Sequence, residues 1–384
     1  MLMCGCNKFP DYQSVVYFTG TEDSPIISFA LDEPAGLGIT VTSSVKATGT
    51  VTAHIKTDPS LVDAYNKSTG RQCQPLPATD YSLSKSSVKI QAGSNISDQA
   101  LLDITTVANV EDGVIYCIPI VITSLETDSD LKVLEASRIT YVIVRKTIVS
   151  KAVSLSSRFF KVPGFYDEPR KLAGVDMERM SAVTMEARVR VTSFQTANPF
   201  ISTIMGVEEI FVFRLGDVTV PNNILQIAGG NSPASANNMP LSPNIWYHVA
   251  VTYNGSSVNI YINGKLEATG DASNRDPVNL LQGPVVNGGI NDRFYIGKST
   301  GNPTATGRGL NGYISEARVW SRALSITELQ DNMCYVDPTS EGLVAYWRFN
   351  EADASGNVLD LTGHGYTATS NNASLTWMDI RCPF

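Results

Sequence analysis

The sequence of 384 residues contains few arrangements that could do covalent chemistry. Hydrolysis of a glycosidic bond uses two carboxylates, and the pattern ExDxxE would place both on one face of a strand, where side chains alternate with a period of two. That pattern does not occur. The stretch EARVW offers only Glu316, so we interpret Glu316 as a structural residue that pairs with Arg318 or Arg348.

Other catalytic and metal-binding patterns are also missing. There is no GxSxG nucleophile motif. DASGN at Asp353 is a turn rather than a sialidase-type Asp box. Three histidines without HExxH, and six cysteines without CxxC, argue against a zinc site. We therefore expect no enzyme, and an enzyme with an unfamiliar site is the weakest alternative.

Charge and hydropathy exclude two kinds of partner. The net charge is −8, and the 29 Lys and Arg residues do not cluster as a nucleic-acid footprint requires. No apolar run approaches the roughly 20 residues of a membrane-spanning helix. We expect no nucleic-acid partner and no membrane span.

The first residues, MLMCGC, resemble the end of a bacterial lipoprotein signal peptide. A small residue precedes Cys6, which would become the lipid-bearing N-terminus after cleavage. The prediction is a signal remnant at 1–10, with Cys6 as the lipid anchor and as the only contact with the membrane. The protein would then lie on the outer membrane or cell surface, or in the periplasm. The alternative is an ordinary short N-terminus.

The elements that must position any site are β-strands. Strand-like runs separated by turn residues fill 11–148 and predict a β-sandwich. A polar stretch at 149–157 is interpreted as a linker. All four tryptophans follow in 158–384. Within 246–270 apolar residues alternate around two Asn-Gly pairs, which favour type I′ hairpin turns.

The second region resembles the laminin-G-like, concanavalin A-like module of bacterial surface proteins. The matching stretches are WYHVAVTYNGSSVNIYINGK, FYIGKS, LNGYISEARVWSRALSITEL and GLVAYWRFNEADASGNVLDLTGHG. The resemblance implies a jelly-roll sandwich of two antiparallel sheets, in which Trp246, Trp320 and Trp347 are core rather than sugar-stacking residues. The sequence departs from the family pattern where Arg188 replaces an aromatic residue.

The first region resembles the N-terminal β-sandwich of unknown function that precedes lectin-like modules and surface endoglycosidases of gut Gram-negative bacteria. VTAHIKTDPSLVDAYN, LPATDYSLSKSSVKIQAGS and EDGVIYCIPIVITS carry this resemblance. It implies an all-β chain with an immunoglobulin-like sandwich before the concanavalin A-like one. The pairing is typical of surface systems for glycan utilisation.

Asp360 matches an aspartate close to a calcium site in related modules, with Asp176 as a possible second ligand. The alternative is an aspartate that caps a turn. In an oxidising compartment Cys334 and Cys382 would form a bridge that pins the C-terminus. Cys73 and Cys117 either pair or leave Cys117 as a buried thiol.

The function predicted from these observations is glycan binding without cleavage. Long polar loops at 229–244, 270–292 and 298–311 are candidates for binding segments. We expect the polar part of the site to include Asn274, Arg275, Asn291 and Asp292. The ligand would be a glycan or polysaccharide, and other surface glycan-binding proteins are possible partners. The principal alternative is an adhesion module with a protein ligand.

Overall fold

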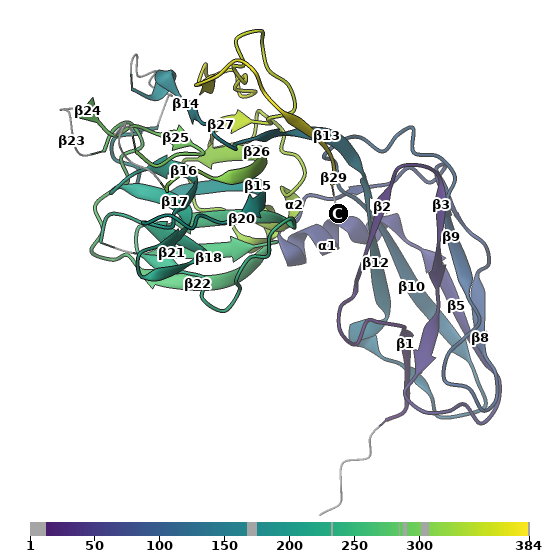
Figure 1. The fold of residues 1–384 in the computed structure, drawn as a ribbon. Coiled ribbons are helices and arrows are strands. Elements are labelled where there is room, and N and C mark those ends of the chain that lie inside the picture. The colour runs from purple at the N-terminus through teal and green to yellow at the C-terminus, as the bar shows by residue number, and fades with distance from the viewer. Residues whose placement is uncertain are drawn as a thin grey trace, which may run out of the picture. The chain divides into compact units, whose positions relative to one another are not determined.

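The computed structural model describes residues 13–166, 175–231, 233–283, 285–286, 290–300 and 307–382. The chain forms two compact units, Met1–Thr147 and Ile148–Phe384. Both are built mainly from β-strands, which confirms the all-β class (Figure 1). Among the described helices, none has the length and apolar character needed to span a membrane. Cys6, the predicted lipid anchor, lies outside the described residues.

Three sheets enclose one apolar core in the first unit. The largest has the order β2-β12-β10-β5-β8 with β6 beside β10, and the others have the orders β3-β9-β7 and β11-β1-β4. The strands are β1 (Val15–Phe18), β2 (Ile26–Leu31), β3 (Ala35–Ile39), β4 (Val41–Ser43), β5 (Val51–Thr57), β6 (Gln74–Pro75), β7 (Tyr81–Leu83), β8 (Ser87–Ile90), β9 (Ala100–Ile104), β10 (Tyr116–Glu126), β11 (Lys132–Val133) and β12 (Ile139–Lys146).

A short helical segment interrupts these strands. A 3₁₀ turn, η1 (Pro59–Leu61), leads into α1 (Val62–Thr69), and a second turn, η2 (Glu135–Ser137), follows later. Pro59 suits the first helical position because its fixed φ is already helical. Gly70 ends α1 with a left-handed φ of 73°, which glycine adopts without steric cost.

Two stacked sheets form most of the second unit, and β23 and β24 pair with each other in a separate two-stranded sheet. One has the order β22-β21-β20-β15-β26-β13-β29 with β27 beside β26, and the other has the order β19-β18-β17-β16-β25-β14-β28. The first of these is called the long sheet below. The strands are β13 (Ile148–Ser154), β14 (Phe160–Lys161), β15 (Val183–Ser193), β16 (Ser202–Val207), β17 (Phe211–Asp217), β18 (Val220–Ala228), β19 (Ala234–Ser235), β20 (Trp246–Tyr253), β21 (Ser257–Ile262), β22 (Lys265–Asp271), β23 (Val285–Val286), β24 (Ile290–Asn291), β25 (Tyr295–Ile296), β26 (Asn311–Trp320), β27 (Leu343–Trp347), β28 (Thr369–Ser370) and β29 (Trp377–Cys382).

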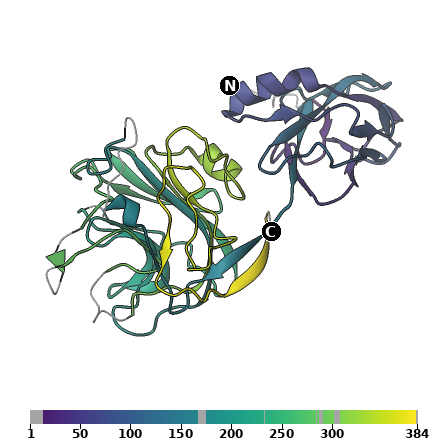
Figure 2. The ribbon, with the colours of Figure 1, turned by 90° about the horizontal axis from the view of Figure 1, so that it is seen from above.

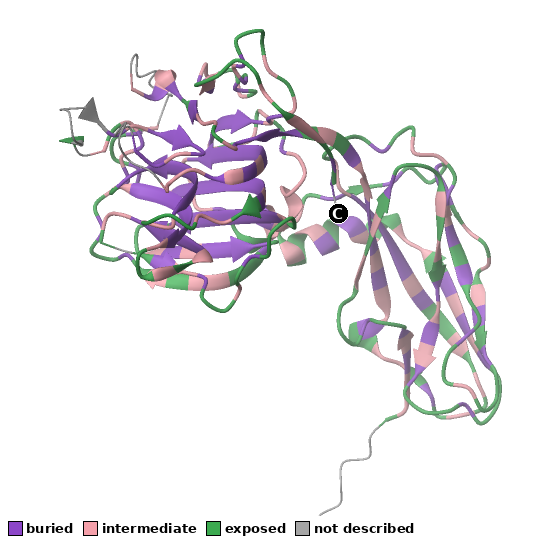
Figure 3. Cartoon of the chain, viewed as in Figure 1, coloured by how far each residue is buried: buried purple, intermediate pink, exposed green. Residues whose placement is uncertain are grey.

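The main core of the second unit lies between its two sheets. Figure 3 shows that β15, β16 and β17 are buried along most of their length. On β15 the core residues Met185, Ala187 and Val189 alternate with Glu186 and Arg188, which are also buried. The face of the long sheet that points away from the core must therefore be covered as well.

Part of that cover is α2 (Ile326–Asp331). It begins with the predicted capping box. The backbone N–H of Glu328 donates to the hydroxyl of Ser325 (3.2 Å), and the N–H of Ser325 donates to the Glu328 carboxylate (2.8 Å). Leu324, Leu329 and Val336 form a small apolar cluster with residues of the long sheet. A 3₁₀ turn, η3 (Pro163–Phe165), lies elsewhere in this unit.

The linker expected at 149–157 is wrong for most of its length. Strand β13 pairs with β29 from Ile148 opposite Cys382 to Val153 opposite Trp377, as Figure 2 shows for the two strands near the C-terminus. It also pairs with β26. The segment is short and mixes apolar residues with Ser150, Lys151 and Ser154, and its partner β29 lies more than 200 residues further along the chain. No local pattern could therefore reveal it as a strand.

The two Asn-Gly pairs form different turns. Asn263 and Gly264 have φ values of 50° and 70°, as a type I′ turn requires. At the other pair only Gly255 has a positive φ, of 90°. There the side chain of Asn254 accepts hydrogen bonds from the backbone N–H groups of Ser256 (3.0 Å) and Ser257 (2.8 Å). A side-chain cap replaces the predicted type I′ geometry.

Candidate functional site

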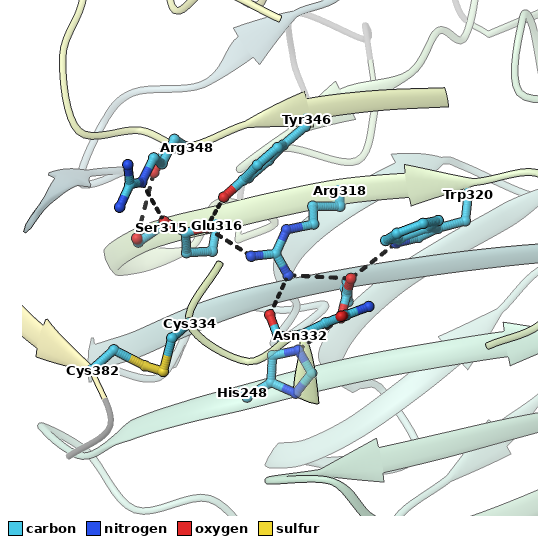
Figure 4. Close-up of polar contacts among 11 residues, drawn as sticks. His248, Ser315, Glu316, Arg318, Trp320, Asn332, Cys334, Tyr346, Arg348 and Cys382 are labelled. Carbon is cyan, nitrogen blue, oxygen red and sulfur yellow. Dashed lines mark hydrogen bonds and ion pairs between the residues drawn. A yellow bond between two sulfur atoms is a disulfide. The ribbon is translucent and has the colours of Figure 1, made fainter. Parts of the chain in front are cut away.

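A buried polar network lies on the covered face of the long sheet (Figure 4). Arg318 on β26 is its centre and has no exposed surface. Its Nη2 donates to Oε2 of Glu316 (2.7 Å), while its Nη1 donates to Oε1 of Glu186 (3.2 Å) and to the carbonyl of Asn332 (2.8 Å). One guanidinium thus joins two carboxylates to the segment that follows α2.

The two glutamates have further partners. Glu186 accepts from Nε1 of Trp320 (2.9 Å) and contacts Nε2 of His248 (2.9 Å). Glu316 accepts from the hydroxyl of Tyr346 and from Nε of Arg348 (3.0 Å). Glu316 therefore pairs with both arginines that the sequence offered as alternatives.

The electrostatics of the network favour its charged forms. Burial acts to lower the pKa of Arg318, but nearby Tyr346, Glu186 and Glu316 raise it overall. Burial acts to raise the pKa of Glu186, but Arg318 and the contact with His248 lower it overall. Burial raises the pKa of Tyr346, and the neighbouring Glu316 adds to that rise. Each charge is compensated within the network, which buried ionic groups require.

The network is closed to substrates. Glu186 and Glu316 are 0% and 1% exposed, and cationic or hydrogen-bonding partners occupy both. The predicted disulfide between Cys334 and Cys382 is present and ties the segment after α2 to β29 (Figure 4). We interpret the network as the polar part of a second core.

Arg188 takes the place of an aromatic residue and lies on the same face of the sheet. Its guanidinium lies 5.5 Å from the centre of the Trp246 ring, and its Nη2 donates to the carbonyl of Arg381 on β29 (3.1 Å). Burial lowers the pKa of Arg188 to about 10. Arginine thus replaces the stacking surface of the aromatic residue with a cation–π contact.

The tryptophans are mainly structural. Trp320 and Trp347 are buried, as the sequence predicts. Nε1 of Trp347 donates to the carbonyl of Tyr366 (2.6 Å). Trp246 and Trp377 are only partly buried.

The structure does not gather the predicted ligand residues at one pocket. Arg275 is buried, and its guanidinium donates to the carbonyl of Ile210 and to that of Gly229 (2.8 Å). It also lies 4.9 Å from the centre of the Phe211 ring. Arg275 therefore holds a loop in place, although the polar sequence around it suggested exposure. Asn274, its neighbour, is exposed.

The remaining predicted ligand residues are Asn291 and Asp292, and the structure describes the side chain of Asp292 alone. Asp292 is fully buried and accepts a hydrogen bond from the hydroxyl of Thr300 (2.8 Å). Asn291 belongs to β24, and its side chain lies outside the described residues. Asp292 thus supports a neighbouring loop from within.

The carboxylate of Asp360 is engaged by nearby backbone groups, as in the turn-capping alternative. Its carboxylate accepts from the backbone N–H groups of Tyr346 (3.0 Å), Thr362 (3.1 Å) and Tyr366 (3.1 Å), and from the hydroxyl of Thr362. Asp176 accepts from the N–H of Glu178 (3.0 Å). Within the described ranges, no three acidic, His or Cys side chains form a possible metal site. The hydrogen bonds that Asp360 accepts from backbone N–H groups are those of an aspartate that caps a turn.

Cys73 and Cys117 are buried thiols that are not joined in a disulfide. Both pack in a small apolar cluster with residues of α1. Burial raises the pKa of Cys117 to about 12, so its thiolate is disfavoured.

An open pocket of about 500 Å³ lies in the second unit. Phe159 is its aromatic side chain. Nε2 of Gln195 donates to the carbonyl of Gly309 (2.6 Å), and Oδ1 of Asn371 accepts from the N–H of Phe159 (2.9 Å). Among the described residues, no protein contact uses Oε1 of Gln195 or Nδ2 of Asn371. The pocket therefore presents a ring beside an acceptor and a donor whose positions are fixed.

This pocket was not evident in the sequence. Its lining residues come from segments that are far apart: 155–159, Gln195, 297–300, 307–311 and Asn371. Two of these segments overlap the predicted binding loop 298–311. Of the predicted ligand residues whose side chains are described, Asn274, Arg275 and Asp292 do not line the pocket, although Asp292 supports Thr300, which does.

Comparison with known proteins agrees with this architecture. Residues 170–330 match the model of the concanavalin A-like lectin/glucanases superfamily, and residues 11–129 match a family of N-terminal domains. The second unit is therefore a concanavalin A-like domain. A search of curated proteins gives no significant match.

Solved structures that are similar to the chain include the following three. A "putative carbohydrate binding protein" from Bacteroides ovatus ATCC 8483 is 27% identical, with a TM-score of 0.54, over 95% of this chain and 97% of its own. EndoBT-3987 of Bacteroides thetaiotamicron is 17% identical, with a TM-score of 0.29, over 34% of this chain and 30% of its own. A SAP-like pentraxin of Limulus polyphemus is 11% identical, with a TM-score of 0.37, over 60% of this chain and 94% of its own.

Proposed function

We propose that the second unit binds a carbohydrate without cleaving it, in the pocket around Phe159. One observation carries the proposal: an aromatic ring lies beside amide groups whose positions are fixed by the backbone. Sugars present apolar C–H faces and many hydroxyls, so an aromatic surface with a few oriented donors and acceptors suits them. The volume of about 500 Å³ is within the range of small-ligand sites.

A second pocket is a poorer candidate. It has a volume of about 450 Å³ and is lined by Ser340, Thr362 and His364 among others. Phe, Tyr and Trp are missing from its described lining, so it offers no large apolar ring for a sugar face. The resemblance over nearly the whole length to a protein described as carbohydrate binding also supports a carbohydrate ligand.

Binding without cleavage is supported by the state of the acidic residues. The paired glutamates of the long sheet are buried and neutralised, so they cannot reach a glycosidic bond in this conformation. Among the described residues that line the open pocket, the charged ones are Arg158, Lys298 and Arg308, and all three are cationic. Hydrolysis with two carboxylates has no basis there.

We further propose that a lipid on Cys6 holds the protein at the outer membrane or cell surface. Several weak sites on one surface would then bind a polysaccharide with higher avidity than one site in solution. The sequence MCGC at residues 3–6, which resembles a lipoprotein cleavage site, supports the proposal. Cells that express the protein are fed labelled palmitate, and we expect the wild type to incorporate the label and Cys6→Ala not to. Equal incorporation by Cys6→Ala would contradict this proposal.

A glycan array tests the main proposal. The full chain is applied to the array with and without calcium, and a panel of extracellular proteins is screened in parallel. We expect binding to glycans that does not need calcium. Binding to proteins alone would favour the adhesion alternative, and release of sugar fragments would show an enzyme.

A further inference from the structure

The charges around the Phe159 pocket are unusual for this chain. The protein carries a net charge of −8, yet the charged residues that line this pocket are Arg158, Lys298 and Arg308. Lys161 lies next to them on β14, opposite Tyr295 of β25. The protein has a negative net charge, so its composition does not explain a cluster of positive charges at this pocket.

The cations differ in how far they are neutralised. Arg308 donates to the carboxylate of Glu208 (2.6 Å), so its charge is already paired. Arg158 donates to two backbone carbonyls, those of Ser374 (2.7 Å) and Ser156 (3.3 Å). These contacts fix the guanidinium but leave its charge uncompensated.

Lys298 is the clearest case. Its ammonium lies 4.7 Å from the centre of the Phe159 ring and 5.7 Å from that of Tyr295. No ion pair joins Lys298, Arg158 or Lys161 to a described carboxylate. Burial and the nearby Lys161 lower the pKa of Lys298, while Asp292 opposes them. An anion in the pocket would favour the charged lysine.

We propose that the sugar bound in the Phe159 pocket is acidic and carries a carboxylate or sulfate group that contacts Lys298 and Arg158. This inference rests on the proposed function and specifies its ligand. The ring of Phe159 takes the apolar face of the sugar, and the two cations take the anionic group. Because the protein as a whole repels polyanions, binding depends on this local site.

Matched polysaccharides test the proposal. The full chain is titrated with polygalacturonate and its fully methyl-esterified form, and with dextran sulfate and dextran. We expect at least one acidic probe to bind about tenfold or more tightly than its neutral counterpart, as a charge-assisted contact would give. The two pairs distinguish a carboxylate from a sulfate. Equal affinity within both pairs would overturn the proposal.

Variants locate the contact. Lys298→Met removes the charge and keeps the apolar stem of the side chain. We expect this variant to bind the acidic probe about tenfold more weakly than the wild type does. Lys151→Met, at an exposed lysine of β13, is the matched control and should bind as the wild type does. If Lys298→Met does not fold, Arg158→Gln takes its place. Unchanged binding by either folded variant would contradict the assignment.

Failure of this inference is distinguishable from failure of the proposed function. If a neutral glycan binds as tightly as the acidic probes and Phe159→Leu weakens that binding, the carbohydrate site stands and the acidic ligand is wrong. If neither the array nor the four probes show binding, both are wrong.

Discussion

Glu316 and Arg318 are two residues apart on β26 and form an ion pair of 2.7 Å, and a bulge at Glu316 turns this pair away from the apolar core. Glu316 has a φ of 54°, and the register of β26 against β15 shifts there. Without the bulge, alternation from the core residue Ile314 would turn Glu316 into the apolar core. The bulge instead brings both charges into one network.

Removal of a carboxylate from this network should be costly. Glu186→Gln leaves the buried Arg318 with one anionic partner fewer and disturbs the contact with His248. We expect a loss of about 3–5 kcal/mol in the free energy of unfolding, measured by urea denaturation. Glu351→Gln, the same substitution at an exposed glutamate, should have no measurable effect. Equal stability of the two variants would show that the network is not stabilising.

The network should also make stability depend on pH. The pKa of Glu186 is lower in the folded protein than its ordinary value of 4.5. Its contribution to stability is therefore complete above that value and is lost as the pH falls through the lower, folded pKa. Urea denaturation between about pH 7 and pH 3 should show a steeper loss for the wild type than for Glu186→Gln. Parallel pH profiles would contradict this prediction.

The hairpin turn at Gly264 should be sensitive for two reasons. Gly264 has a φ of 70°, and a Cβ there would lie 2.5 Å from Cγ of Gln330 on α2. Gly255 also has a positive φ, but a Cβ there would meet only Ser181, at 3.4 Å. We expect Gly264→Ala to lower the melting temperature more than Gly255→Ala, since only the first adds a clash to a backbone cost of about 1–3 kcal/mol. The reverse order would sink this explanation.

The position of β13 changes where the domains can be separated. A fragment that begins at Ile148 keeps the partner of β29, whereas a fragment that begins at Arg158 loses it. We expect 148–384 to unfold cooperatively, and 158–384 to be less stable or to aggregate. Thermal melting and gel filtration of both fragments would check this. Indistinguishable fragments would mean that β13 contributes little.

Local patterns predicted the elements whose partners are close in sequence. The alternation in 246–270 gave the strands of that hairpin region, and the Ser325 box gave the start of α2. Strand β13 and the bulge at Glu316 escaped because each depends on a distant strand. The prediction for Arg275 was wrong because a polar loop suggests exposure, whereas its two Nη atoms donate to three backbone carbonyls in a buried position.

The sequence predicted that a polar loop would carry binding residues, but it did not predict which residues line the pocket. A long polar loop indicated that 298–311 could carry binding residues, and part of it lines the pocket. Phe159, Gln195 and Asn371 carry no motif, and only the folded sandwich brings them together. The pairing of Glu316 was accessible because charges alternate with apolar residues in EARVW.

Calorimetry on the Phe159 pocket tests the central claim most directly. A glycan identified on the array is titrated into the wild type, into Phe159→Leu, which removes the ring but keeps an apolar side chain, and into Ser340→Ala in the second pocket. Because a favourable contact with an aromatic ring contributes roughly 0.5–1.5 kcal/mol beyond its buried area, we expect Phe159→Leu to weaken binding up to about tenfold and Ser340→Ala to leave it unchanged. Undiminished binding by a folded Phe159→Leu variant, or loss of binding in Ser340→Ala, would contradict the account.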